Sequence, residues 1–437
     1  MKGLITTLSL LKEKTDGKSV AILGFGREGR STLKALQKSG TNAEITVLDK
    51  NDIFDKKDFS VQFITGDSYM ENLSRFDLIF KSPGIVVKGI EREKITSQTE
   101  LFLQRFSAQT VGITGTKGKS TTTTLIHHIL KNTRGNAVLV GNIGIPAFDR
   151  IDDINDETII VYELSCHQLE FCEVSPHIAV LLNLFPEHLD HYGTLENYYN
   201  AKRNIYLHQS ENDLLFCNAE IIPKNAKSRV ISVSRDNADI TFGEDFIKYG
   251  DKKISFKMGE LPLIGMHNVY NIAMTFGVCS TWNIYGDDFL SALRTYKSLP
   301  HRLEIFAEID GVKYVDDSIS TACETTEQAV RSLKNVGVLL IGGMDRGIDY
   351  APLIAFLRER KLPNVICMYD SGRRIFDEAK QIEGTNLFLA NDLKEACELA
   401  KGLAKSGEYC LLSPASASYG FFKNFEERGE RFKEYIL

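Results

Sequence analysis

A glycine-rich loop that ends in Gly118-Lys119-Ser120 is the stretch of this sequence with the clearest chemical meaning. The loop follows the apolar run Val111-Gly112-Ile113 and leads into a predicted helix, so its backbone N–H groups can surround a polyphosphate. Lys119 can reach the β- and γ-phosphates of a nucleotide, and Ser120 can bind Mg²⁺. The spacing departs from the usual P-loop, because five residues separate Gly112 from Gly118. We predict a nucleotide triphosphate site here; the alternative is a tight strand-to-helix turn.

Two acidic positions are candidate metal ligands. Glu163 directly follows the apolar run 158–162, and a buried carboxylate is costly unless a cation or hydrogen-bond donor accompanies it. Mg²⁺ beside the glycine loop would be such a cation, whereas a surface or helix-capping glutamate is the alternative. The segment Glu187-His188-Leu189-Asp190-His191 combines two acids with two histidines. It is equally consistent with a metal site and with a polar turn, because Mg²⁺ prefers oxygen ligands.

Two predicted helices carry further polar candidates. Lys202 and Arg203 lie in the segment 196–209, whose apolar spacing predicts a helix, and the residue types alone favour a solvated basic face for both. Asn268 and Asn271 are three residues apart in a helix predicted from residue 265, so they share one face. Buried asparagines without a ligand would be costly, although a helix cap is the alternative for Asn268.

A second glycine motif, Gly24-Phe25-Gly26-Arg27-Glu28-Gly29, lies between a predicted strand at 19–24 and another at 46–49. With Asp49 at the end of the second strand, it matches the fingerprint of dinucleotide-binding βαβ units. Taken alone, the motif is consistent with NAD, with another nucleotide diphosphate or with a structural turn. The run 76–80 predicts a further strand, and the turn 81–84 after it could close over the same ligand.

The elements that must position these residues predict an α/β fold of three domains, each with a mostly parallel sheet. We expect a Rossmann-like domain at 1–106, a P-loop domain at 107–298 and a second Rossmann-like domain at 299–437. Ligands of such sheets bind at the carboxyl ends of the strands, which makes 141–144, 163–165 and 183–191 site candidates. The predicted strands of the second and third domains are 137–140, 158–162, 177–184, 338–341, 364–369, 386–390 and 408–412, with a hairpin at 305–315.

The overall composition is that of a soluble globular protein. The chain has 437 residues, 43% of them hydrophobic, and a net charge of −6, which argues against a general nucleic-acid or membrane-surface binder. No run approaches the ~20 apolar residues that span a bilayer, and residues 1–14 lack the apolar core of a signal peptide. The eight cysteines form no C-x-x-C pair, so we expect free thiols in a reducing cytoplasm and no structural zinc.

The ordered motifs of the chain resemble those of the Mur ligases, the ATP-dependent amino-acid-adding enzymes of peptidoglycan synthesis. The resemblance covers all three predicted domains and includes the unusual spacing of the glycine loop. The segment 411–432 is most similar to the family member that adds D-glutamate to UDP-N-acetylmuramoyl-L-alanine. The motifs that carry the resemblance are 114–120, 163–170, 183–190, 199–202, 267–271, 300–302 and 317–318.

The resemblance implies a ligase that uses ATP to make an acyl phosphate. It also implies that two Mg²⁺ ions assist the reaction and that Lys202 is carbamylated by CO₂. It implies that the catalytic residues are Lys119, Lys202, His188 and Glu163 and that the metal ligands are Ser120, Glu163, His188 and Lys202. The expected ATP-binding residues are Gly115, Thr116, Lys117, Gly118, Lys119, Ser120, Thr121, Asn271, Arg302 and Asp317. The expected contacts of the UDP substrate are Gly24, Phe25, Gly26, Arg27, Asp49, Lys50, Ser82, Gly84, Asn142 and His188.

The amino acid is expected to bind through Thr321, Arg346, Ser418, Tyr419 and Phe425. Two positions differ from the family pattern: Ile319 and Arg346 stand where a lysine is expected. Because arginine can grip a carboxylate with two hydrogen bonds, we expect Arg346 to carry more of this role.

The sequence alone is also consistent with three other functions. The first is another Mur-type or a folylpolyglutamate-type ligase, the second an NAD-dependent oxidoreductase, and the third a non-catalytic nucleotide-binding module. For the ligase we expect small-molecule substrates, UDP-N-acetylmuramoyl-L-alanine and glutamate, no nucleic-acid partner, no membrane insertion and a monomer.

Overall fold

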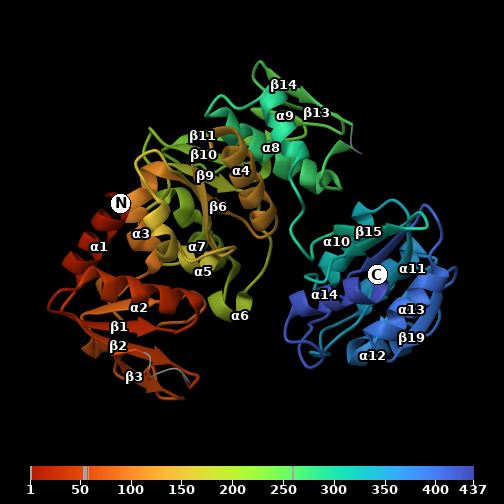
Figure 1. The fold of residues 1–437 in the computed structure, drawn as a ribbon, viewed down its shortest axis with the longest axis horizontal. Helices are drawn as coiled ribbons and strands as arrows, with labels where there is room; N and C mark the ends of the chain where they lie inside the picture. The colour runs from red at the N-terminus through yellow and green to blue at the C-terminus, as the bar shows by residue number, and fades with distance from the viewer. Residues whose placement is uncertain (1, 53–56, 58, 258–259) are drawn as a thin grey trace. The chain divides into compact units, whose positions relative to one another are not determined.

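The computed structural model describes residues 2–52, 57, 59–257 and 260–437. These residues form two compact units: Met1–Glu260 with His267–Tyr296, and Leu261–Met266 with Lys297–Leu437. Within the described residues the first unit contains two sheets and the second contains one (Figure 1). The α/β class with largely parallel sheets is therefore confirmed, while the division into three domains stays a prediction.

The first sheet is parallel throughout, in the strand order β3-β2-β1-β4-β5. Strand β1 is an almost wholly buried apolar run, as expected for a central parallel strand that helices cover. The βαβ unit predicted around the first glycine motif is confirmed as β1, α2 and β2. The bounds are α1 Lys2–Thr15, β1 Ser19–Leu23, α2 Arg27–Ser39, β2 Glu44–Asp49, β3 Gln62–Thr65, β4 Leu78–Lys81, β5 Ile95–Thr96 and α3 Gln98–Phe106.

The second sheet has the order β14-β13-β12-β11-β10-β9-β6-β8-β7 and is parallel from β7 to β12. The loop strand β6 lies between β8 and β9, so the carboxyl ends of these three strands meet at one edge. The bounds are β6 Thr110–Thr114, α4 Lys119–Arg134, β7 Ala137–Gly141, β8 Ile159–Glu163, α5 Cys166–Leu169, β9 Ile178–Leu181, α6 Leu189–Tyr192, α7 Leu195–Leu207, β10 Leu214–Asn218, β11 Arg229–Ser234, β12 Ile240–Phe242, β13 Phe246–Tyr249, β14 Lys252–Ser255, α8 Met266–Ser280 and α9 Gly286–Arg294.

Helix α3 connects the first two sheets through a shared core. Its Phe102 is fully buried and meets the ring of Tyr162, at the end of β8, edge-on with 5.6 Å between centroids. Beside it, the hydroxyls of Thr99 and Tyr162 form a hydrogen bond of 2.9 Å. At the start of α3, the side-chain amide of Gln98 donates a hydrogen bond to the hydroxyl of Ser31 on α2. The glycine turn of the first sheet and the strand ends of the second are thus held in one packed unit.

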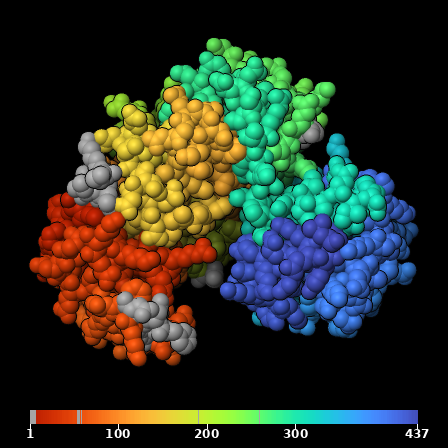
Figure 2. All heavy atoms as spheres, in the orientation of Figure 1, coloured from red at the N-terminus to blue at the C-terminus, as the bar shows by residue number. Residues whose placement is uncertain are grey.

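The sheet of the second unit has the order β15-β16-β20-β17-β18-β19 and is parallel except for the β15–β16 hairpin. Helices α10, α11 and α12 contribute to the core on one face, and α13 and α14 to the core on the other, which confirms the predicted doubly wound arrangement; Figure 2 shows residues 297–437 as the turquoise-to-blue body. The bounds are β15 Glu304–Ile309, β16 Val312–Asp316, α10 Cys323–Ser332, β17 Val336–Ile341, α11 Ala351–Arg360, β18 Asn364–Met368, α12 Tyr369–Ala379, β19 Asn386–Ala390, α13 Leu393–Leu403, β20 Tyr409–Leu412 and α14 Phe425–Ile436.

Among the helices formed by the described residues, none combines the length and the apolar character that crossing a membrane requires.

A buried arginine fastens the loops at the carboxyl edge of the third sheet. Arg428 on α14 is fully buried, and burial lowers its pKa to about 10. Its guanidinium donates to the hydroxyl and carbonyl oxygens of Ser318, at 3.0 and 2.8 Å, and to the carbonyl of Ser416 at 3.0 Å. One side chain therefore joins the loop after β16 to the loop after β20.

We predict that Arg428→Met destabilises the second unit by about 2–4 kcal/mol, because it leaves buried acceptors without a donor. Hydrogen exchange of the amides in β16 and β20 measures this loss. Arg431→Met is the matched control, since Arg431 lies on the same helix but is half exposed and pairs with Glu434, a contact worth about 0–1 kcal/mol. Equal protection in the two variants would contradict the role assigned to Arg428.

Candidate active site

The glycine loop after β6 has a backbone that only glycine adopts easily. Gly115 and Gly118 have φ of +155° and +83°. A Cβ atom on Gly115 would lie 2.9 Å from the Cβ of Leu182, and one on Gly118 would lie 2.8 Å from Oδ1 of Asn271. Both glycines are therefore required by conformation and by space. Asn271, predicted to bind the nucleotide, lies against the loop and is buried with Asn268, which accepts a hydrogen bond from its amide.

Asn183, at the end of the neighbouring strand, holds the loop in shape. Its Oδ1 accepts hydrogen bonds from the N–H groups of Thr116 and Lys117, at 3.0 and 2.8 Å, and its amide donates to the carbonyl of Lys117. The Thr116 hydroxyl lies 3.0 Å from that of Tyr198 on α7. Asn183 lies in a segment predicted to belong to the site, but its role in bracing the loop was not predicted. The contact of Tyr198 with the loop was not predicted either.

Two lysines converge on the same carbonyl of the loop. The ammonium groups of Lys119 and Lys202 each donate to the oxygen of Gly115 at 2.9 Å. Lys202 is only 1% exposed, and its nitrogen lies 4.9 Å from the centroid of the Tyr198 ring. Burial lowers the pKa of both lysines, and for Lys202, where the charge of Lys119 adds to the effect, the pKa falls to about 7.

The solvated basic face expected from residue types is therefore wrong for Lys202. Helix α7 turns this residue toward the strand ends, while Arg203, one position along, is partly exposed and pairs with Glu196. An amine with a pKa near 7 is neutral in roughly half of the molecules at pH 7, and the neutral form is nucleophilic.

Glu163 is the acidic partner of these lysines. It ends β8 and is fully buried, so it is not a surface residue, and Ser165 is the residue that caps the following helix. The amide of Asn142 donates to Oε1 at 2.7 Å, whereas Oε2 is buried with no hydrogen-bond partner among the described residues. An unpartnered buried carboxylate oxygen needs a cation. Together with the hydroxyl of Ser120, the second residue of α4, this oxygen offers the hard ligands that Mg²⁺ prefers.

His188 stands at the rim of this edge. It has φ of +55°, and its side chain is 45% exposed. Its ring centroid lies 5.9 Å from that of Tyr198 and 5.1 Å from that of His167. Next to it, Glu187 forms an ion pair of 2.6 Å with Lys117 of the glycine loop. The side chain of Asp190 lies outside the described part, so the choice between metal site and polar turn stays open for this segment.

The first glycine motif borders a cavity of about 360 Å³ at the carboxyl edge of the first sheet. The predicted contacts Gly24, Gly26, Arg27, Asp49, Lys50 and Ser82 line it, as do Tyr69 and Asn51, which were not predicted; Phe25 and Gly84 are not part of the lining. The carboxylate of Asp49 accepts a hydrogen bond of 2.6 Å from the Phe25 N–H, and the Ser82 hydroxyl donates to the Gly24 carbonyl. These contacts fix the turn at the mouth of the cavity.

The remaining predicted residues belong to the second unit. Asp317 is buried, and burial raises its pKa to about 6 although the Leu303 N–H and the Ser413 hydroxyl both donate to it. Nε of Arg302 is buried without a hydrogen-bond partner among the described residues. Of the residues predicted for the amino acid, Ser418 is buried, Thr321 and Phe425 are half-buried, and Tyr419 and Arg346 are exposed.

Comparison with known proteins identifies the family of the chain. Residues 113–279 match the model of the Mur ligase middle domain. A UDP-N-acetylmuramoylalanine–D-glutamate ligase from Acetivibrio thermocellus is 33% identical, over 99% of this chain and 98% of its own length. One of the same name from Clostridium tetani is 34% identical, over 96% of both chains. The chain belongs to the Mur ligase family.

The fold of the Mur ligase family agrees with the sheets described above. The crystal structure of the MurF ligase from Thermotoga maritima in complex with ADP superposes with a TM-score of 0.60, over 98% of this chain and 97% of that one, at 19% identity. The family resemblance inferred from the motifs is thus confirmed, and the irregular loop spacing between Gly112 and Gly118 occurs in a chain of this family.

We predict that Gly118→Ala lowers nucleotide affinity at least tenfold, about 1.4 kcal/mol, because the new methyl group forces the loop away from Asn271. Titration with ADP measures it. Gly135→Ala is the matched control: this glycine follows the other end of α4 with φ of +79°, and no described atom lies within 4 Å of its would-be Cβ. It should lose stability but keep its affinity for ADP. Similar affinities in both variants would contradict the steric argument.

Proposed function

We propose that this chain adds D-glutamate to UDP-N-acetylmuramoyl-L-alanine in peptidoglycan precursor synthesis, with conversion of ATP to ADP and phosphate. The observation that carries the proposal is the group formed around the glycine loop by half-buried Lys119 with fully buried Lys202 and Glu163. It combines a lysine for the phosphates, a second lysine whose pKa burial lowers to about 7, and a carboxylate with one oxygen that lacks a hydrogen-bond partner among the described residues. Its particular substrates follow from the names of the full-length relatives and from the segment 411–432.

The chemistry needs little from the protein except positioning and charge neutralisation. An oxygen of the alanyl carboxylate attacks the γ-phosphorus of ATP, the bond to the β-phosphate oxygen breaks, and ADP leaves from an acyl phosphate. The amine of D-glutamate then attacks the acyl carbon and loses a proton to solvent, and the carbon–oxygen bond to phosphate breaks. Lys119 neutralises the β- and γ-phosphates, and Asn142 contacts the substrate near the reacting carboxylate. Asn271 and the loop N–H groups orient ATP.

Mg²⁺ would be held by Ser120 and Glu163, and a second ion by His188 and carbamylated Lys202, where it would supply positive charge for the phosphate oxygens. The burial of Lys202 supports the carbamate. Its lowered pKa leaves a neutral amine whose nitrogen can bond to the carbon of CO₂ and release one proton, and the product is an anion in place of a cation. An ammonium at this position would repel the second ion.

We assign the cavity of the first sheet to the UDP group, whose diphosphate can approach the Gly24–Gly26 turn. An NAD-dependent oxidoreductase would also use this turn, but it would leave the lysines and Glu163 around the glycine loop without a role. A folylpolyglutamate-type ligase would use the loop but has no use for a UDP cavity. A non-catalytic nucleotide-binding module would not need the fully buried Lys202 beside the glycine loop.

The second unit would supply the amino-acid site and further contacts for ATP. We assign Arg302 and Asp317 to ATP. The glutamate carboxylates would bind Arg346, whose exposed side chain makes no hydrogen bond or ion pair with another described residue, together with Thr321, Ser418, Tyr419 and Phe425. We further propose a monomer in the cytoplasm, where the eight cysteines, all of them free and buried, suit a reducing environment.

Phosphate release tests this function. We predict release from ATP only when both UDP-N-acetylmuramoyl-L-alanine and D-glutamate are present, because the acyl phosphate forms on a bound carboxylate and is discharged by an amine. Omission of either substrate is the control. Equal release without one of them contradicts the ligase, and turnover with L-glutamate but not D-glutamate contradicts the assigned stereochemistry.

For Lys202 we predict that Lys202→Ala lowers kcat by about 10²–10³-fold, the usual loss when a preorganised charge beside a reacting group is removed. A small carboxylate such as acetate should restore part of the rate by replacing the carbamate. Arg203→Ala, on the same helix but partly exposed, is the matched control and should keep its rate. A dead but folded Lys202→Ala variant that acetate does not rescue would contradict the carbamate.

A further inference from the structure

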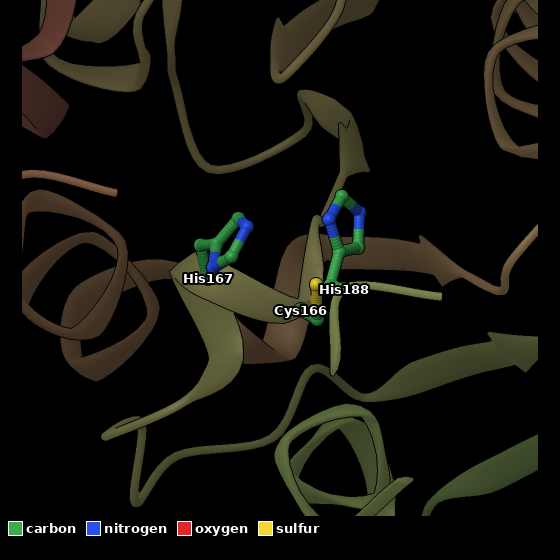
Figure 3. A group of neighbouring side chains, drawn as sticks. All are labelled: Cys166, His167 and His188. Atoms are coloured by element: carbon green, nitrogen blue, oxygen red, sulfur yellow. The ribbon is translucent and has the colours of Figure 1, made fainter. Parts of the chain in front are cut away.

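Three side chains form a cluster at the carboxyl edge of the second sheet, and the proposed reaction does not use them as a group. Cys166 and His167 begin α5, and His188 precedes α6. One ligand atom from each, the sulfur of Cys166 and a ring nitrogen of each histidine, lies within 4.8 Å of the other two (Figure 3). Cys166 is buried, His167 half-buried and His188 exposed, so the cluster opens to solvent on the side of His188.

We propose that Cys166, His167 and His188 bind a borderline-soft transition-metal ion, with Zn²⁺ as the best match, and that this ion inhibits the enzyme. One sulfur and two imidazole nitrogens form the ligand set of zinc sites with an open fourth position, which water fills. Around a tetrahedral zinc these atoms would be roughly 3.3–3.6 Å apart, so small side-chain rotations suffice. Binding breaks the S–H bond of Cys166 and releases its proton to solvent.

The ligand types separate this site from the magnesium ligands. Mg²⁺ takes oxygen atoms and avoids sulfur, whereas thiolate and imidazole favour zinc, copper and cobalt. Glu163 and Ser120 therefore offer hard oxygen ligands, and the cluster of Cys166 offers soft ones. His188 is shared, since it is also the proposed ligand of the second Mg²⁺.

In two other clusters of possible metal ligands, a lysine of the protein already pairs with a carboxylate of the cluster. His167, Glu170 and His191 also come within 4.8 Å of one another, but Glu170 pairs at 3.1 Å with Lys81, whose side chain is 3% exposed. A metal there would leave this buried ammonium without its partner.

In the second unit, His301, Glu304 and Asp316 form the third such cluster. The ammonium of Lys433 lies 2.9 Å from Glu304 and 3.8 Å from Asp316. Among the clusters found in the described residues, that of Cys166 is the one in which no ligand forms an ion pair with a lysine.

Inhibition follows from the shared histidine. A zinc ion on Cys166 and His167 would hold the His188 ring and withdraw it from the catalytic metal. This second half of the inference rests on the proposed function, whereas the binding of metal does not.

Titration of the full chain with Co²⁺ and Zn²⁺, without substrates, tests the binding. We expect Co²⁺ to produce a sulfur-to-metal charge-transfer band in the near ultraviolet and Zn²⁺ to abolish it. Cys166→Ser should remove the band, and both Cys166→Ser and His167→Gln should weaken Zn²⁺ binding at least about tenfold, since even outer-sphere partners of a metal are worth about 10–100-fold. Glu170→Gln is the control and should bind Zn²⁺ as the unmodified chain does. ADP titration verifies that each variant is folded.

Absence of the band in the unmodified chain, or Zn²⁺ affinity that Cys166→Ser leaves unchanged, overturns the site. Loss of affinity in Glu170→Gln instead assigns the metal to the cluster with His191 and overturns it as well. For inhibition, Zn²⁺ should slow phosphate release at constant Mg²⁺, and Cys166→Ser should require at least about ten times more Zn²⁺. Equal inhibition of both forms overturns the inhibitory role, and a chain that binds zinc but shows no ligase activity overturns the proposed function and leaves the binding site standing.

Discussion

Two ammonium groups that share one carbonyl oxygen are the constraint on which the rest of the site depends. Lys119 and Lys202 both donate to the carbonyl of Gly115; Lys119 is half-buried and Lys202 is fully buried. Like charges in a buried place repel strongly, so the arrangement is stable only if one amine gives up its proton or anions are added. Glu163 supplies one anion within the protein, and a triphosphate would supply more. Burial, together with the charge of Lys119, lowers the pKa of Lys202 to about 7, which favours loss of its proton.

The scaffold explains why these groups meet. Parallel pairing of β6 with β8 brings Ile113 beside Glu163, so the loop that leaves β6 begins next to the carboxylate that ends β8. Helix α7 packs its Tyr198 and Lys202 side against the same edge, where Tyr198 braces Thr116. Glu163 ends a buried strand, and Tyr198 and Lys202 lie on a buried helix face, so packing of the scaffold positions these groups beside the glycine loop.

Local patterns predicted the elements well because the strands of a parallel sheet are continuous apolar runs, and the polar residues at their ends show where ligands bind. The burial of Lys202 could not be predicted in this way. It depends on which side of α7 meets the sheet. The apolar face of α7 is formed by Tyr198, Ile205 and Tyr206, and this pattern does not predict that a lysine is buried within the face. The cluster of Cys166, His167 and His188 was missed for a related reason. Its ligands lie on separate segments, at the starts of α5 and α6, and no spacing rule joins the pair at 166–167 to residue 188.

Two of the buried acidic side chains in the described residues, Asp316 and Glu163, differ in how their charge is met, and this difference supports Glu163 as a ligand of the proposed metal. In the second unit, Asp316 accepts from His301 at 2.6 Å and from the Ser318 N–H, and Lys433 lies nearby. The hydrogen bond and charge of Asp316 raise the pKa of His301 even though burial works to lower it. That carboxylate is satisfied by the protein itself. Glu163 keeps one oxygen without a partner among the described residues, beside a loop built for phosphate. The carboxylate of Asp316 has protein partners for its charge, whereas Oε2 of Glu163 has none among the described residues. This contrast supports the proposal that Oε2 of Glu163 binds a cation that enters with the substrate.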